Sequence, residues 1–99
     1  MLMTFDFIAL AQHNVQFMAR LKDAVSKHSD DEIIMKPYKL TFHAHKQIVT
    51  LRPYSETSEF YHKIVPKEIT YQALMKMLNN DWENIGEDDI KDIEPFVPF

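Results

Sequence analysis

The sequence has no cysteine, only one glycine and no apolar run long enough to cross a bilayer. Without cysteine, the chain can form no disulfide framework, no thiolate zinc site and no cysteine nucleophile. With Gly86 as its only glycine, it has no glycine-rich phosphate loop and no flexible glycine linker. The first seventeen residues contain no lysine or arginine and several polar side chains, so we expect no secretory signal and a cytoplasmic location.

The remaining composition is that of one soluble domain. The chain has 99 residues, of which 45% are hydrophobic and 26% charged. This length is sufficient for one core, and the sequence shows no internal repeat and no low-complexity segment. We therefore expect a single domain over residues 1–99.

The net charge of −4 is distributed unevenly along the chain. Residues 1–32 carry three bases and five acids, residues 33–67 six bases and two acids, and residues 68–99 two bases and eight acids. A basic middle therefore lies between acidic ends. An asymmetry of this kind indicates charged partners more than a particular fold.

The N-terminal segment predicts one helix over residues 4–27. Its apolar side chains recur three or four residues apart, which is the period of a helix with one buried face. Thr4 or Asp6 can cap its start, and Lys22 and Lys27 suit its end. The predicted stripe comprises Ile8, Ala11, Val15, Met18, Leu21 and Val25, widened by Leu10, Phe17 and Ala24.

From Ile33 the apolar period becomes two, as in a strand. Residues 38–45 alternate apolar and polar side chains, and the β-branched segment 48–52 predicts a second, antiparallel strand. Pro37 cannot donate to a ladder, so we expect the first strand to lie at an edge or to bend there. Segment 55–65 fits either a short helix or an irregular strand.

The helical period returns over residues 68–84. The predicted buried stripe comprises Tyr71, Leu74, Leu78, Trp82 and Ile85, reinforced by Ala73 and Met77. Gly86 stands where a helix end favours a left-handed residue. A short final helix is predicted over residues 88–93, ending before Pro95.

These elements predict an α+β two-layer sandwich, in which helices cover one face of an antiparallel β-hairpin of two or three strands. A two-stranded sheet is marginal by itself. We therefore expect either a third strand or a homodimer formed through an edge strand.

His43 and His45 are the candidate metal ligands. Residues two apart on a strand share a face, so both could bind one ion together with His13, His62 or a carboxylate. Lys39 lies on the same predicted face, where an ammonium group disfavours a bound cation. Metal binding is therefore the second alternative, and we expect no cofactor.

The sequence offers no pattern for catalysis. Its serines and threonines lie in no nucleophile elbow, and the adjacent acids at 30–32 and 87–89 do not form a general acid and base flanking a substrate. We expect no enzymatic activity and name no catalytic residue.

The basic hairpin, residues 36–67, is the candidate nucleic-acid-binding surface. Basic side chains neutralise phosphates, and exposed rings stack on bases. The residues of this alternative are Lys36, Lys39, Lys46, Arg52 and Tyr54.

The acidic C-terminal third is the favoured candidate, and we expect it to bind a protein partner with a basic surface. Its residues are Asp81, Glu83, Glu87, Asp88, Asp89, Asp92 and Glu94, with Phe96 and Phe99 as apolar anchors unless these two rings cover the core. Acids accelerate encounter with a basic surface, and buried rings supply affinity.

The last three residues, Val97, Pro98 and Phe99, resemble the C-terminal tip of bacterial single-stranded-DNA-binding proteins. That resemblance implies a terminal Phe in an apolar pocket of a partner, with its carboxylate near a basic residue. The upstream chain lacks the five-stranded barrel pattern and the linker of that family. The sequence thus predicts a small binding or accessory protein, such as an inhibitor, immunity or mobile-element module, with no membrane partner.

Overall fold

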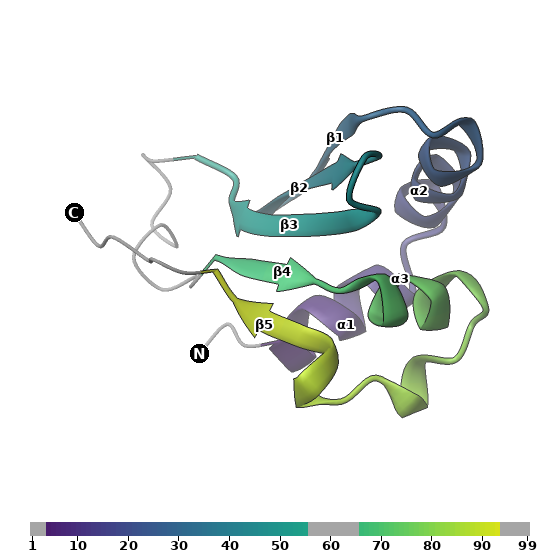
Figure 1. Cartoon of the computed structure of the whole chain (residues 1–99). Helices are drawn as coiled ribbons and strands as arrows, with labels where there is room; N and C mark the ends of the chain where they lie inside the picture. The colour runs from purple at the N-terminus through teal and green to yellow at the C-terminus, as the bar shows by residue number, and fades with distance from the viewer. Residues whose placement is uncertain (1–3, 56–65, 94–99) are drawn as a thin grey trace.

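A computed structural model describes residues 4–55 and 66–93 of the chain. The described elements are α1 (Thr4–Gln12), α2 (Val15–Lys27), β1 (Asp31–Met35), β2 (Tyr38–His43), β3 (Ile48–Pro53), β4 (Lys67–Ile69), α3 (Tyr71–Leu78), the 3-10 turns η1 (Trp82–Asn84) and η2 (Glu87–Asp89), and β5 (Ile90–Asp92). Helices and one antiparallel sheet make this an α+β protein, as the sequence predicted (Figure 1).

The sheet has five strands in the order β1-β2-β3-β4-β5, and every neighbouring pair is antiparallel. Figure 1 shows the strands side by side from β1 at the top to β5 at the bottom. Helix α2 packs against β1 and β2, and α3 packs against β3. Because α3 lies between β4 and β5 in the chain, the last strand returns to the sheet only after the helix.

One face of the sheet forms the core with the helices. Alternate residues of β2 are buried, which confirms the predicted period of two. The sheet contributes Ile33, Met35, Tyr38, Leu40, Phe42, Val49, Leu51, Ile69 and Ile90 to a single cluster with Phe7, Ala11, Phe17, Leu21, Ala24, Ala73, Leu74, Met77, Trp82 and Ile85. Phe7 of α1 lies at the centre of the aromatic part, with edge-on contacts to Phe17 and Tyr38.

The N-terminal segment forms two helices where the sequence predicted one. Asn14 interrupts the helix, because its extended backbone and its Oδ1, which accepts a hydrogen bond from the Phe17 N–H at 2.9 Å, begin α2 as a new N-cap. The break rotates the second helix relative to the predicted stripe. Val15 is therefore 80% exposed, while Phe17, Leu21 and Ala24 form the buried face of α2.

The prediction of two or three strands was too low. Segment 31–35 is an additional edge strand, and Pro37 lies in the turn that joins it to β2, so β2 is an inner strand. Strands β4 and β5 have three residues each, which is too short for a clear alternation in the sequence. With five strands in one sheet, the reason to expect edge pairing between two chains no longer applies.

The C-terminal helix is shorter than predicted, and the final helix is replaced by η2 and β5. Helix α3 begins at Tyr71, where Thr70 Oγ1 accepts a hydrogen bond from the Ala73 N–H, and Tyr71 is 49% exposed instead of buried. The left-handed residue after α3 is Asn80, with φ 59°, whereas Gly86 has no positive φ. Leu74, Trp82 and Ile85 are buried as the stripe predicted.

Two further expectations concern location and the middle of the chain. Within residues 4–55 and 66–93, none of the helices has the length and apolar character that crossing a membrane requires. Most of segment 55–65, predicted as a short helix or an irregular strand, lies outside the described residues.

Candidate binding surfaces

The connection between α3 and β5 carries most of the acidic residues that the sequence singled out, and an ion pair holds it in place. Lys76 Nζ donates to Asp89 Oδ2 at 2.7 Å and to the backbone carbonyl oxygen of Asn84 at 2.9 Å. The Gly86 N–H donates to the same Asp89 carboxylate oxygen at 3.0 Å. One lysine and one carboxylate therefore fix both ends of segment 84–89.

A second set of contacts attaches this connection to the start of α3. The backbone N–H and the hydroxyl of Thr70 both donate to the Asp89 carbonyl oxygen, at 3.1 and 2.8 Å. The hydrogen bond from Lys76, assisted by the Gly86 N–H, lowers the pKa of Asp89 against the opposing effect of burial. The carboxylate is thus ionised at neutral pH and serves as a fixed anchor for Lys76.

Asp89 is therefore not available to a partner, although the sequence placed it in the binding set. It is 6% exposed and its carboxylate is directed into the protein. Asp92 forms an ion pair with Lys67 across β4 and β5. The Glu87 side chain lies outside what the structure describes, as do Glu94, Phe96 and Phe99.

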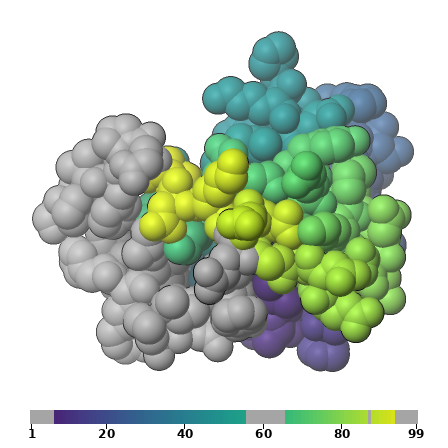
Figure 2. Space-filling model, turned by 60° about the horizontal axis from the view of Figure 1, so that its bottom comes forward, coloured from purple at the N-terminus to yellow at the C-terminus, as the bar shows by residue number. Residues whose placement is uncertain are grey.

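Three carboxylates of the connection lie at the protein surface and pair with no cation among the described residues. We call Asp81, Glu83 and Asp88 the acidic surface. Glu83 and Asp88 are exposed, Asp81 is half-buried, and none of the three forms an ion pair within residues 4–55 and 66–93. Asp81 Oδ1 accepts one hydrogen bond from the Asn84 side chain. In Figure 2, the side of the molecule that faces the viewer carries residues from α3 to β5, coloured green to yellow.

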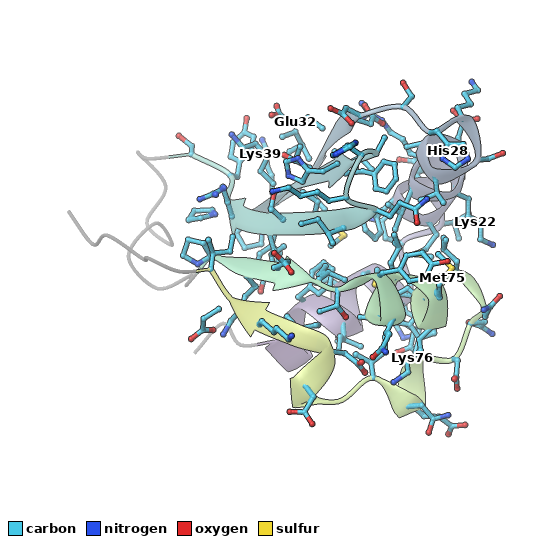
Figure 3. The ribbon with its side chains drawn as sticks, in the orientation of Figure 1. Lys22, His28, Glu32, Lys39, Met75 and Lys76 are labelled. Atoms are coloured by element: carbon cyan, nitrogen blue, oxygen red, sulfur yellow. The ribbon has the colours of Figure 1, made fainter. Side chains whose placement is uncertain are left out.

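An exposed aromatic ring lies at the start of α3 near Asp88, whereas Asp81 and Glu83 follow the C-terminal end of the helix. Tyr71 follows Thr70, and Asp88 precedes Asp89, so the Thr70–Asp89 hydrogen bonds bring Tyr71 and Asp88 to the same region. Met75, one turn further along α3, is half-buried (Figure 3). The sequence assigned Tyr71 to the core because its spacing from Leu74 is helical. The Thr70 cap, which could have been recognised from the sequence, places Tyr71 in the first turn.

The sheet face opposite the helices forms the second charged surface, which we call the open face. Its side chains lie in rows across the strands, since register partners share a face. One row joins Ile34, Lys39 and Arg52, and the next joins Glu32, Thr41, Thr50, Glu68 and Lys91. Lys39 and Arg52 are therefore direct cross-strand neighbours, near the start of β2 and the end of β3.

Lys36 and Tyr54 extend the open face beyond the Lys39–Arg52 row. Lys36 Nζ lies 4.8 Å from the centroid of the Tyr54 ring, and the Tyr54 N–H donates to the Pro37 carbonyl oxygen at 2.8 Å. Four of the five residues of the nucleic-acid alternative thus meet at one end of the open face. The fifth, Lys46, is exposed in the turn between β2 and β3, at the opposite end of the hairpin.

The two candidate metal ligands, His43 and His45, lie in different elements, the first in β2 and the second in the turn that follows it. Strand β2 ends at His43, so His45 lies in the turn and the rule that alternate strand residues share a face does not apply to it. His43 Nε2 lies 3.0 Å from Thr50 Oγ1. Over residues 4–55 and 66–93, no three His, Asp or Glu side chains are placed to hold one metal ion.

The acidic surface and the open face each carry charged side chains that could bind a partner of opposite charge. Figure 3 shows Lys39, on the open face, and Lys76, which holds the α3–β5 connection, on different parts of the molecule. Comparison of the chain with protein families, with curated proteins and with solved structures gives no match.

Proposed function

We propose that the chain is a non-enzymatic binding protein that engages a partner protein with a basic surface. The contact would be made by the acidic surface, with Tyr71 as its apolar anchor. The main support is that Asp81, Glu83 and Asp88 form no ion pair within residues 4–55 and 66–93. Lys76, the only base between residues 68 and 90, is engaged by Asp89 and Asn84.

The internal contacts of the connection favour binding because they fix the shape of the surface beforehand. A loop that must become ordered on binding loses part of its interaction free energy to that ordering. Here, Lys76 and Thr70 already hold the connection at Asn84 and at Asp89. A partner would meet carboxylates on a preformed segment.

The charges and the ring would contribute to different steps of binding. Exposed carboxylates accelerate association with a basic partner, and salt screens this effect. Tyr71 is 49% exposed, and tyrosine is among the residues enriched at the energetic centres of interfaces. We therefore expect acidic substitutions to lower the association rate and Tyr71 substitutions to raise the dissociation rate.

The test compares matched variants of the full chain. Immobilised wild-type protein and the variants Asp88→Asn, Tyr71→Ala, Asp23→Asn and Val15→Ala are incubated with the same extract, and bound proteins are quantified by mass spectrometry. Asp23 and Val15 are exposed on α2 and serve as the charge and apolar controls. We expect a basic protein that Asp88→Asn and Tyr71→Ala weaken and the two controls retain.

The purified partner then gives the decisive rates. Association with Asp88→Asn should be slower at low salt and converge with wild type as salt rises. A partner that responds equally to Asp23→Asn and Asp88→Asn binds by general charge only. That result, or recovery of no protein that depends on these residues, contradicts the proposal.

A further inference from the structure

We infer that the open face binds single-stranded nucleic acid at the end formed by Lys36, Lys39, Arg52 and Tyr54. This inference is independent of the proposed function, because it uses residues of β2, β3 and their flanking turns and none from the acidic surface. The observation that carries it is the convergence of three cations and an aromatic ring on a sheet face that the helices leave uncovered.

The cations of this surface are arranged to neutralise more than one phosphate. Lys39 and Arg52 are register partners, and Lys36 lies beside Tyr54, two residues along the strand from Arg52. Same-face rows of a sheet are separated by roughly 7 Å, because each residue rises about 3.4 Å. The surface therefore presents charge at successive positions along the strand direction, as a phosphate backbone does.

The ring supplies the contact that distinguishes a nucleic acid from other polyanions. Tyr54 is 38% exposed, and Lys36 occupies one face of its ring. Bases stack on aromatic side chains of sheet surfaces without sequence preference, and only an unpaired strand exposes its bases for such stacking. Thr41 and Thr50, in the next row, continue the polar surface along β2 and β3.

Two carboxylates, of Glu32 and Glu68, also lie on the open face, where a negative charge opposes the binding of a phosphate. Glu32 Oε2 lies 4.0 Å from Lys39 Nζ, and Glu68 is the register partner of Thr50 (Figure 3). Glu32 therefore competes with a phosphate for Lys39. Removing the Glu32 charge should therefore strengthen the binding of single-stranded nucleic acid.

The experiment measures fluorescence anisotropy of a labelled oligothymidylate titrated with the full chain from about 50 to 200 mM salt. For single strands, the slope of log affinity against log salt is about −0.7 for each contacted phosphate, so three contacts give about −2. Lys39→Gln and Arg52→Gln should each reduce the slope by about 0.7. Lys22→Gln, on exposed α2 and distant from the open face in Figure 3, should not change it.

Two further comparisons test the ring and the competing acid. Tyr54→Leu should weaken binding about fivefold or more, whereas Tyr54→Phe should retain it. Tyr71→Leu, at the other tyrosine that is exposed within residues 4–55 and 66–93, should have no effect. Glu32→Gln should increase affinity. Circular dichroism and thermal melting establish that each variant remains folded.

Several results would overturn the inference. One is the absence of binding at about 50 mM salt, where phosphate contacts are strongest. Another is an equal loss with Lys22→Gln and Arg52→Gln. Equal affinity for duplex DNA, heparin or polyglutamate, together with no effect of Tyr54→Leu, would identify the open face as a general polyanion or acidic-protein surface.

Discussion

Lys76 Nζ and Asp89 Oδ2 lie 2.7 Å apart although the two residues are thirteen positions apart in the chain. Because Lys76 also binds the Asn84 carbonyl and Asp89 also binds the Gly86 N–H, this ion pair links α3 to the segment that leads into β5. It shapes the acidic surface without being part of it.

Asp89→Asn should lower the free energy of unfolding by about 1.5–3 kcal/mol, the usual range for a hydrogen bond to a charged group. The amide retains the size of the side chain but removes the charge that faces Lys76. Asp88→Asn, at the exposed neighbour, should stay within about 0.5 kcal/mol of wild type. Urea unfolding of both variants measures the difference, and equal effects would show that the Lys76–Asp89 contact contributes little.

The stability of the protein should fall as the pH decreases from about 5 to 3. The pKa of Asp89 lies below its ordinary value of 3.8 because of the hydrogen bond from Lys76, and that of Asp31 is lowered by the hydrogen bond from Arg20. Both carboxyls therefore bind protons more readily in the unfolded chain. Their contribution is present above that range and is lost as pH falls through the folded-state pKa.

Comparing unfolding curves of wild type and Asp89→Asn across this pH range isolates one of the two groups. The free energy of unfolding of the variant should depend less on pH, because Asp31 still titrates and the amide at position 89 does not. A dependence identical to that of wild type would mean that the Asp89 pKa is the same in the folded and unfolded chains.

Asn14→Ala should destabilise the protein by about 1 kcal/mol, since the Asn14 side chain caps the first turn of α2. Asn14→Ser should retain most of the stability because a hydroxyl can accept the same hydrogen bond from the Phe17 N–H. Gln16→Ala, exposed in that turn, is the control. Thermal unfolding distinguishes the three, and a neutral Asn14→Ala would argue against a break between α1 and α2.

Substitutions of Phe7 should show how strongly α1 is held to the sheet. The centroid of its ring lies 6.4 Å from that of Phe17 and 5.7 Å from that of Tyr38, and both contacts are edge-on. Phe7→Leu should cost about 1 kcal/mol through the lost ring contacts, and Phe7→Ala about 3–5 kcal/mol. Leu10→Ala, at a 43% exposed position of the same helix, should cost less than about 1 kcal/mol. Equal losses at both positions in urea unfolding would contradict the packing of α1.

Local patterns predicted the fold class and the inner hairpin. The alternation around Leu40 depends on burial of one face of a strand, which a short window of sequence records directly. The strand at Ile90 has two charged residues after a single buried one, so no window shows its partner. Its place in the sheet is set by pairing with Ile69, a contact between distant segments.

The candidate surfaces were predictable to different degrees. The sequence placed Lys39 on the polar face of its strand, whereas the pairing of Lys39 with Arg52 is set by the register of the folded hairpin. The contact of Lys36 with Tyr54 depends on a turn whose shape the sequence did not indicate. The sequence predicted Asp89 as a partner-binding residue because its acidic side chain is visible there. Its burial against Lys76 arises only in the folded chain.

The strand pairs of the sheet differ in the length of the chain that connects their two strands. Residues 36–37 join β1 to β2 and residues 44–47 join β2 to β3, whereas residues 54–66 and 70–89 separate the remaining pairs. Closing a longer loop costs more chain entropy. We expect β1, β2 and β3 to form the unit most protected from amide hydrogen exchange, and β4 and β5 to open first. Transient opening of the protein would thus begin at the strand pair next to the α3–β5 connection.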